Sequence, residues 1–510
     1  MAHDLGTTGD KAVLFDLERG MVGRAFSAYP TAYPQATWAE QDPNDWWRAF
    51  CEASREVISF CSISPEEIAV ISFSGQMMGC LPLDREGVPL RRAIIWADQR
   101  ATAEAMGLLE RVRLEDGYRI TGHRIGPAYS VAKIMWLAAY EPEVFEKTYK
   151  FLQAKDFIAH KLTGKWATDF SDACGTGLLH IHKRCWSEEI AKLAGIDLEK
   201  LPPVHPSTEV VGEVTREAAS EAALSPGIPV VIGGGDGVCA TAGAGVVDEG
   251  VGHIYLGSSA WVAGASRGPV LDPKMRTFTW PHLDPGLYSP NGTMHNAGSS
   301  LEWAKEALGA LELRVSEWLG LNPYDLLEKE AERVPAGAEG LIFLPYLMGE
   351  RSPNWNPDAR GVFLGITRKH TKAHLLRAVY EGVAFNLRTI FQALGELGVE
   401  LQEVRVIGGG AKSRLWTQIL ADVLGRPLTV TAAPQEATAL GAAMAGAVGA
   451  GLLRDFREAA ERFVELSETV EPCSAADVYE ELHSVFLKAY EALVPVFALL
   501  VGKGGANGQA

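Results

Sequence analysis

Two kinds of apolar stretch alternate along the first half of the chain. Apolar residues at helical spacing run through residues 45–60 and through much of residues 99–162. Short continuous apolar runs have the length and composition of buried strands, and they occupy residues 11–15, 68–74, 93–96 and 229–232. Strands that alternate with helices in this way predict an α/β fold.

The second half begins the same alternation again. It predicts strands at residues 252–256, 260–265, 341–344 and 404–407, and helices at residues 300–308, 372–397, 414–424 and 437–450. Each half also contains an apolar strand, a turn of glycine and hydroxyl residues, and a returning strand. We therefore expect two similar domains, at residues 1–247 and 248–500, with a cleft between them and a flexible tail at residues 501–510.

Composition and charge narrow the class of function. The chain has 510 residues, of which 47% are hydrophobic and 22% charged, as in globular proteins with large cores. Its formal net charge of -17 argues against nucleic acid or an anionic membrane as a partner. The longest apolar run near the C-terminus, residues 492–501, is too short to span a bilayer, so no membrane partner is expected.

The seven cysteines form no CxxC pair and show no zinc-ligand spacing with histidine. This predicts reduced thiols in a cytoplasmic protein. No charged-then-apolar leader is apparent, so no secretion signal is expected.

The first turn, at residues 4–11, has the composition of a phosphate-binding hairpin. Gly6 lets the backbone approach a phosphate closely, and successive N–H groups of a turn form an anion-binding nest. Thr7 and Thr8 add hydroxyl donors, and Asp4 is placed to hold a water bound to Mg²⁺. The alternative is an ordinary tight hairpin. Only three residues precede Asp4, which indicates a clipped start or a short first strand.

Two further glycine-rich turns are candidates for chemistry. Gly257, Ser258 and Ser259 lie between two strands and form a second possible phosphate turn, or a plain hairpin. Asp236 follows a buried strand and precedes a helix, where its carboxylate is placed to accept a proton from a sugar hydroxyl. The alternative is that Asp236 only caps the helix that follows.

Residues 408–413 connect a strand to a helix, so a nucleotide could rest on the helix N-terminus. This stretch is neither a dinucleotide fingerprint nor a P-loop. One side of the helix at 437–450 carries small residues, which favour close helix packing or the approach of a flat group: Thr438, Gly441, Ala442 and Ala445.

Polar and aromatic residues end two neighbouring strands, at residues 74–79 and 96–100. Open α/β sheets place ligands at strand ends. Trp96 offers a flat apolar face, and Asp98 and Arg100 offer hydrogen bonds of the kind sugars use. The alternatives are a core tryptophan and a surface salt bridge, with Met77 and Met78 as packing residues.

Together these motifs resemble the FGGY family of carbohydrate kinases over nearly the whole chain, and within it the members that phosphorylate xylulose. About ten motifs follow the order of the family, and Lys133 to Trp136 fit part of the family signature better than Pro127 and Ala128 do. The motifs are DLGTTGDKA, WAEQDPNDWW, GQMMG, IIWADQRA, KDFIAHKLTG, TDFSDACGT, GGGDGVCATAGAG, YLGSSAWV, FLPYLMGERSPNWNPDARGVFLG, VIGGGAKSRLWTQILADVLG and EATALGAAMAG.

The resemblance implies two domains of the actin/hexokinase/Hsp70 type (ribonuclease H-like), each a mixed five-stranded sheet flanked by helices, with the active site in the cleft between them. It implies ATP and Mg²⁺, with Asp236 as catalytic base and Asp4 as the second catalytic carboxylate, both holding the metal through water. The sugar residues implied are Gln76, Met77, Met78, Trp96, Asp98, Arg100 and Asp236. The ATP residues implied are Gly6, Thr7, Thr8, Lys11, Gly257, Ser258, Ser259, Gly409, Gly410, Ala411 and Arg414.

Two departures from the family pattern bear on the substrate. The usual Gln-Met-His reads Gln76-Met77-Met78, and the usual Asp-Asn reads Asp236-Gly237. The predicted reaction transfers the γ-phosphate of ATP to a primary hydroxyl of a ketopentose, D-xylulose before others. Ribulose, erythritol or a deoxy sugar remain alternatives, as does an ATPase-type switch or sugar sensor on the same fold. A homodimer is one expected assembly.

Overall fold

The computed structural model describes residues 1–504, with side chains described for residues 1–500. The described chain forms two compact units. Unit 1 comprises Met1–Glu249, Ala265–Pro290 and Glu436–Val464, and unit 2 comprises Gly250–Gly264, Asn291–Gln435 and the chain from Glu465 onward. Of the predicted tail at 501–510, residues 501–504 continue helix α18 (Ala476–Gly504), and residues 505–510 lie outside the described residues.

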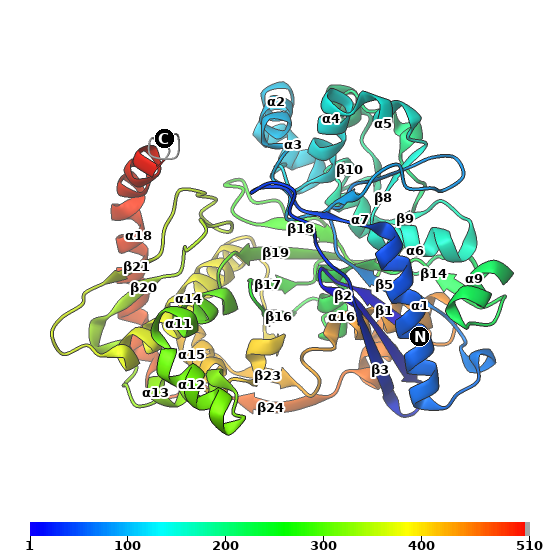
Figure 1. The fold of residues 1–510 in the computed structure, drawn as a ribbon. Helices are drawn as coiled ribbons and strands as arrows, with labels where there is room; N and C mark the ends of the chain where they lie inside the picture. The colour runs from blue at the N-terminus through cyan, green and yellow to red at the C-terminus, as the bar shows by residue number, and fades with distance from the viewer. Residues whose placement is uncertain (505–510) are drawn as a thin grey trace. The chain divides into compact units, whose positions relative to one another are not determined.

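Unit 1 is built on a five-stranded sheet in the order β15-β5-β1-β2-β3 (Figure 1). The strands are β1 (Ala2–Leu5), β2 (Gly9–Asp16), β3 (Gly20–Ala28), β5 (Ser72–Gly75) and β15 (Gly234–Gly235). β1 pairs antiparallel with β2 and parallel with β5, and β15 is parallel to β5. The sheet is therefore mixed and five-stranded, as the resemblance implied.

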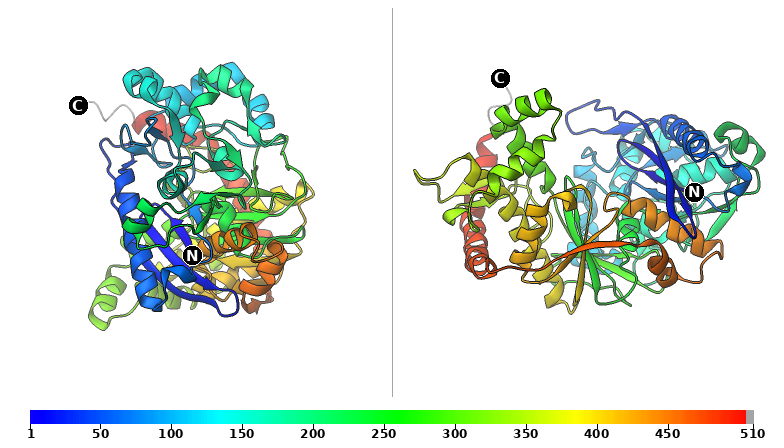
Figure 2. Two further views of the ribbon diagram at one scale, coloured as in Figure 1. Left: turned by 90° about the vertical axis from the view of Figure 1, so that its right-hand side faces the viewer. Right: turned by 90° about the horizontal axis from the view of Figure 1, so that it is seen from below.

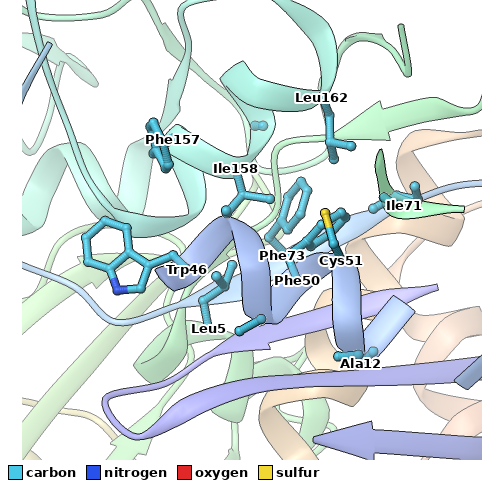
Figure 3. Close-up of a cluster of buried hydrophobic side chains, with 14 of the residues drawn as sticks. Leu5, Ala12, Trp46, Phe50, Cys51, Ile71, Phe73, Phe157, Ile158 and Leu162 are labelled. Carbon is cyan, nitrogen blue, oxygen red and sulfur yellow. The ribbon is translucent and has the colours of Figure 1, made fainter. Parts of the chain in front are cut away.

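The main core of unit 1 lies between this sheet and helices α1 (Pro43–Cys61) and α6 (Ala154–Thr163). α1 begins where the Asp42 side chain accepts the Asn44 N–H, with proline at its first position, and ends at Ser62 in the left-handed conformation. Trp46 and Phe50 of α1 are buried with Phe73 and Phe157 (Figure 3). Each such side chain contributes about 1.5–3 kcal/mol when buried.

Two helices of unit 1 come from far along the chain. α16 (Ala437–Gly449) packs on α10 (Asp236–Gly243) and on β1 and β5, and α17 (Phe456–Phe463) packs on α16. In both views of Figure 2 these orange helices lie beside the dark-blue N-terminal strands. α10 and α16 approach closely, because a Cβ on Gly441 would lie 2.0 Å from the Cys239 carbonyl oxygen. The small side of the 437–450 helix is thus a packing surface.

The rest of unit 1 consists of short ladders and helices that surround the central sheet. The paired strands are β4 (Glu40–Gln41) with β7 (Ala93–Ile94), β6 (Leu81–Leu83) with β8 (Lys150–Leu152), β9 (Thr168–Asp169) with β12 (Val204–His205), β10 (Leu179–His180) with β11 (Cys185–Trp186), and β13 (Val210–Glu213) with β14 (Pro229–Val231). The helices are α2 (Thr102–Val112), α3 (Leu114–Thr121), α4 (Ser130–Tyr140), α5 (Pro142–Lys147), α7 (Phe170–Gly175), α8 (Glu188–Ala194) and α9 (Arg216–Ala222).

The second sheet has seven strands, in the order β18-β19-β17-β16-β22-β23-β24. Their bounds are β16 (Val251–Leu256), β17 (Ala260–Gly264), β18 (Phe278–Pro281), β19 (Tyr288–Met294), β22 (Glu403–Ile407), β23 (Leu428–Thr431) and β24 (Leu466–Val470). The five inner strands are the mixed sheet that was expected. The correction is one additional strand at each edge, β18 and β24. β24 reads LSETV and four of its five residues are exposed, so it contains no continuous apolar run.

Unit 2 also contains the small ladder β20 (Ile342–Leu344) with β21 (Val362–Leu364) and a set of helices. These are α11 (Gly298–Leu308), α12 (Ala310–Leu319), α13 (Pro323–Ala331), α14 (Lys372–Glu396), α15 (Arg414–Leu424) and α18. The window Ala476–Leu500 of α18 is long and apolar enough to cross a membrane by length and composition, and 22% of it is buried. The helix packs Tyr479 and Phe486 inward beside Phe385 of α14.

The predicted domain boundary at residues 247/248 lies two residues from the first crossing between units, at Glu249/Gly250. A single boundary does not describe the chain, however, because Ala265–Pro290 and Glu436–Val464 also belong to unit 1. The second segment does so because α16 fills the surface of α10 and β5.

Candidate functional site

Asp4 lies near the edge of the first sheet where the parallel strands β1, β5 and β15 end. It pairs with Ser74 across the β1–β5 ladder, and Ser74 pairs with Gly234 across the next. Asp236 directly follows β15 as the first residue of α10. Strand order therefore brings two carboxylates that are far apart in sequence to one edge of one sheet.

The Asp236 carboxyl group is electrostatically tuned. Burial and the negative charge of Asp4 raise its pKa to about 7, although the Gly237 N–H donates to Asp236 Oδ1 at 2.7 Å. A carboxyl group with a pKa near the working pH is suited to accept and release a proton. Asp236 also begins α10, so the helix-start alternative and the base role are compatible.

The turn at Gly6–Thr8 directs its carbonyl groups into the protein. The Gly6 oxygen accepts from the Tyr29 hydroxyl and from Gln76 Nε2, and the Thr7 oxygen accepts from Gln41 Nε2 at 2.7 Å. Within the described chain, the N–H groups of Thr7 and Thr8 donate to no protein acceptor. This is the arrangement that an anion-binding turn requires.

Lys11 and Asp4 are held by residues at the start of α16, which sequence reasoning did not assign to the site. Lys11 Nζ lies 3.0 Å from Glu436 Oε2 and 3.8 Å from Asp4 Oδ2, and Glu436 also pairs with Arg24. Thr438 Oγ1 donates to Asp4 Oδ2 at 2.6 Å. Thr438 therefore orients the Asp4 carboxylate across 434 sequence positions, a contact that no local pattern signals.

Gln76, Met77 and Met78 follow β5 at the same edge. Gln76 is buried and donates to the Gln41 side chain at 2.8 Å, so it supports the turn at residues 6–8. The Met77 side chain lies over Gly235, where a Cβ would come within 2.5 Å of its sulfur. Met78 has φ +62, a left-handed conformation that is unfavourable for methionine.

Trp96, Asp98 and Arg100 differ in how far their side chains are exposed to a ligand. Trp96 is 43% exposed and donates from Nε1 to Thr7 Oγ1 at 2.9 Å, so it is not a core tryptophan. Asp98 and Arg100 form a buried bidentate pair, and the Arg100 guanidinium also lies 3.7 Å from the Trp38 ring centre. Asp98 and Arg100 do form a salt bridge, but the alternative of a surface salt bridge is wrong, because the pair is buried and the Trp38 ring covers it.

A buried charge network supports the strand that leads to Asp236. Lys155 lies between Asp156, Asp169 and Asp172, at 2.8, 2.9 and 3.2 Å. Asp169 accepts from the Ser171 hydroxyl, and the Gly235 N–H donates to Ser171 Oγ at 2.9 Å. Sequence reasoning did not assign these residues, although two of the quoted motifs contain them.

Unit 2 contains a cavity of about 420 Å³ beside the predicted nucleotide residues. Such a volume is within the usual range for small-molecule sites. Gly257, Ser258, Gly409 and Gly410 line it, whereas Ser259, Ala411 and Arg414 are not among its lining residues. Its other walls include Trp416, Tyr380, Tyr324, Asn322, Glu302, Asp325, Glu328, Lys412 and Gln435.

The backbone at the cavity requires glycine at one position. Gly408 has φ +89, and a Cβ there would lie 2.5 Å from the Leu256 carbonyl oxygen. The short helical turn Gly409–Lys412 and the N-terminus of α15 follow at once. Ser258, which also lines the cavity, is held by its carbonyl oxygen, which accepts from the Ala297 and Ser299 N–H groups.

Within residues 1–504, no group of three or more His, Cys, Asp or Glu side chains is arranged to hold a metal ion. Asp4 and Asp236 are suited to bind a metal ion with fewer protein ligands. Mg²⁺ usually keeps several waters and binds through one or two carboxylates together with substrate phosphates. The two carboxylates are compatible with that mode.

Comparison with known proteins identifies the family. The profile of the FGGY family of carbohydrate kinases matches as its N-terminal domain at residues 1–243 and as its C-terminal domain at residues 252–450. The chain is 31% identical over 491 residues to a gluconokinase of Bacillus licheniformis, covering 96% of this chain and 95% of the relative. It is 32% identical over 495 residues to the xylulose kinase of Escherichia coli (strain K12), covering 97% and 99%.

A solved structure agrees. The xylulose kinase from Rhodospirillum rubrum is 32% identical, covers 97% of this chain and 99% of its own, and superposes with a TM-score of 0.89. Sequence and structure thus match over nearly the full length. The chain belongs to the FGGY family of carbohydrate kinases and is a sugar kinase.

Proposed function

We propose that this sugar kinase transfers the γ-phosphate of ATP to a primary hydroxyl of a ketopentose, with D-xylulose as the first candidate. The single observation that carries the proposal is the placement of Asp236, with its pKa raised to about 7, at the same sheet edge as Asp4. Similarity to xylulose kinases supports the substrate class.

In the proposed reaction the Asp236 carboxylate accepts the proton of the sugar hydroxyl as its oxygen attacks the γ-phosphorus. A new O–P bond forms, the bond from that phosphorus to the bridging oxygen of ADP breaks, and ADP leaves with the bond electrons. Mg²⁺, held by Asp4 and Asp236 through water, would neutralise charge on the phosphates. The turn N–H groups of Thr7 and Thr8 offer donors to a phosphate oxygen.

In unit 2, the cavity of about 420 Å³ is proposed to hold the adenosine of ATP. Trp416 and Tyr380 supply aromatic walls, and the backbone at Gly409 and Gly410 lets a ligand approach closely. Ser259, Ala411 and Arg414 stay predicted nucleotide contacts.

Gluconate is the second candidate substrate, because a gluconokinase is among the similar proteins. The charges in unit 1 favour a neutral sugar over this acid. Asp4 and Asp236 place negative charge at the site, while the cation of Arg100 is paired with Asp98 and that of Lys11 with Glu436. A substrate carboxylate would thus meet repulsion without a free lysine or arginine side chain among these groups to offset it.

A coupled ADP-release assay over D-xylulose, D-ribulose, erythritol, gluconate and no sugar tests the proposal. We expect release that depends on D-xylulose and yields xylulose 5-phosphate. Asp236→Asn should lower kcat about 10²- to 10⁴-fold, the usual contribution of a general base, while ATP still binds. Glu86→Gln, at an exposed carboxylate of the same unit, is the matched control.

Three results would count against parts of the proposal. ADP release that needs no sugar would support the ATPase or sensor alternative. Greater activity with another sugar, a polyol or gluconate would replace D-xylulose as substrate. An unimpaired kcat of Asp236→Asn would remove the base assignment.

A cytoplasmic location remains part of the proposal, and all seven cysteines are free thiols in the structure.

A further inference from the structure

Lys133 is a fully buried lysine whose ammonium group contacts only backbone oxygens. Its side chain is 0% exposed, and Nζ donates to the carbonyl oxygens of Met78, Ile95 and Ala128 at 2.7, 2.8 and 2.7 Å. An ammonium has three N–H donors, so the charged group is fully used. Loss of the ammonium group would leave the buried Ile95 carbonyl and the two partly buried carbonyls of Met78 and Ala128 without this donor, which is unfavourable.

The three carbonyls belong to three segments that are distant in sequence. Met78 lies in the loop after β5, Ile95 directly precedes Trp96, and Ala128 lies just before α4. Two of these segments carry the sugar residues predicted from the sequence. The start of α4 adds a second link, because the Ser130 hydroxyl donates to the Gly79 oxygen at 2.6 Å.

The contact with Met78 does more than fill a hydrogen bond. Met78 has φ +62, a left-handed conformation that is unfavourable for a non-glycine residue and persists only where the surroundings impose it. Lys133 holds the carbonyl oxygen of this residue. Without that bond, we expect the 76–79 loop to relax, and with it the side chains of Met77 and Met78.

No ion pair accounts for the burial of Lys133. Burial lowers the pKa of Lys133 to about 7, and the groups that face it are Cys80, Asp98 and Arg100. Asp98 bonds Arg100 and the Ala39 N–H instead. Within the described part of the chain, the three carbonyl groups are therefore the hydrogen-bond partners of the Lys133 ammonium group.

We propose that Lys133 is a positioning residue that fixes three backbone segments as one frame for the sugar. This inference rests on the proposed function, since it concerns the site that would hold the sugar. It assigns no contact between Lys133 and the substrate. Substrate recognition would be done by side chains that the frame carries, at residues 76–78 and 96.

The test compares Lys133→Met with Lys150→Met. Lys150 is an internal control in unit 1, because it is also buried and its Nζ also donates to two backbone oxygens, those of Glu199 and Leu201 at 2.6 and 2.9 Å. For Lys133→Met we expect kcat/KM for the sugar to fall about 10- to 100-fold, as expected when reacting groups are misplaced by about 1 Å, mainly through a higher KM. The KM for ATP should change less than about twofold.

Lys133→Gln keeps two N–H donors and should give an intermediate KM for the sugar. Equal sugar KM values in Lys133→Met and Lys150→Met would overturn the inference. Such a result would mean that loss of Lys133 has no more effect on the sugar site than loss of a buried lysine elsewhere in unit 1. The failure of the proposed function looks different: the wild-type enzyme would then show no sugar-dependent ADP release at all.

If neither Lys133 variant folds, hydrogen exchange on the wild-type enzyme decides the question. Addition of D-xylulose, the proposed substrate, should slow the exchange of backbone amides in residues 75–80, 93–100 and 124–133 together. Protection of one of these segments without the other two would overturn the frame.

Discussion

Asp4 and Asp236 are two carboxylates at one sheet edge with different surroundings. Asp4 accepts a hydrogen bond from the Thr438 hydroxyl and lies 3.8 Å from Lys11, whereas Asp236 is half-buried and accepts the Gly237 N–H. Burial and the charge of Asp4 raise the pKa of Asp236 to about 7. This raised pKa is what supports the proposed role of Asp236 as the base.

The pKa of Asp236 sets the expected pH dependence of catalysis. In the proposed reaction only the ionised carboxylate accepts a proton, so kcat/KM for the sugar should rise as the pH rises through about 7 and then level off. Asp4→Asn removes the like charge that helps to raise this pKa, so the acidic limb should move to lower pH even though kcat/KM falls overall. Profiles of kcat/KM between about pH 5 and 9 check this, and an acidic limb that stays in place in Asp4→Asn would contradict it.

At the scale of elements, α10 and α16 of unit 1 pack backbone against backbone. A Cβ on Gly441 would lie 2.0 Å from the Cys239 carbonyl oxygen, and one on Gly243 would lie 1.8 Å from that of Ala437. Backbone lies against backbone here, so no side chain can rotate away. Both residues that orient Asp4 and Lys11, Thr438 and Glu436, stand at the start of α16.

Gly441→Ala should therefore lower the free energy of unfolding by more than about 2 kcal/mol. This is a net loss, because the clash outweighs the roughly 1 kcal/mol by which alanine is a better helix former than glycine. Gly107→Ala is the matched control, because Gly107 also lies inside a helix, α2, and a Cβ there meets nothing within 4 Å. The control should be stabilised by about 0.5–1 kcal/mol. Urea unfolding measures both, and equal midpoints would contradict the close-packing argument.

The longer helices and the apolar strands could be predicted from the sequence because their signals are local, whereas most short strands of the small ladders could not. The strand at residues 404–407 and the helices at 414–424 and 437–450 agree with the structure to within a residue or so. Partners could not be predicted in this way. The hydrogen bond from Thr438 to Asp4, the cover of Trp38 over Arg100 and the three acceptors of Lys133 depend on tertiary contacts between distant segments.

For the whole molecule, the path of the chain between units matters more than a linear division. Unit 1 takes Ala265–Pro290 and Glu436–Val464 from beyond residue 249. A division at residues 247/248 is natural for the sequence, since the two family profiles also match on either side of it. It would nevertheless remove α16 and α17 from the unit in which they pack.

We therefore expect residues 1–247 expressed alone to be insoluble or molten, because the surfaces of α10, β1 and β5 that α16 covers would be exposed. Joining the three segments of unit 1, residues 1–249, 265–290 and 436–464, through flexible linkers should restore a cooperative thermal transition. Near-UV circular dichroism and calorimetry distinguish the two fragments. A cooperative transition in the 1–247 fragment would contradict this account.

The lysine that holds three carbonyl groups has a consequence for how substrate choice can change over evolution. Hydrogen bonds to backbone oxygens are indifferent to the side chain of the residue that supplies them. A residue such as Met78 can therefore be exchanged, as the departure from the family's usual histidine indicates, while the scaffold that presents it stays the same. Under the proposed function, a site built in this way can accept a different sugar through a change of one side chain, while the backbone segments that carry it stay in place.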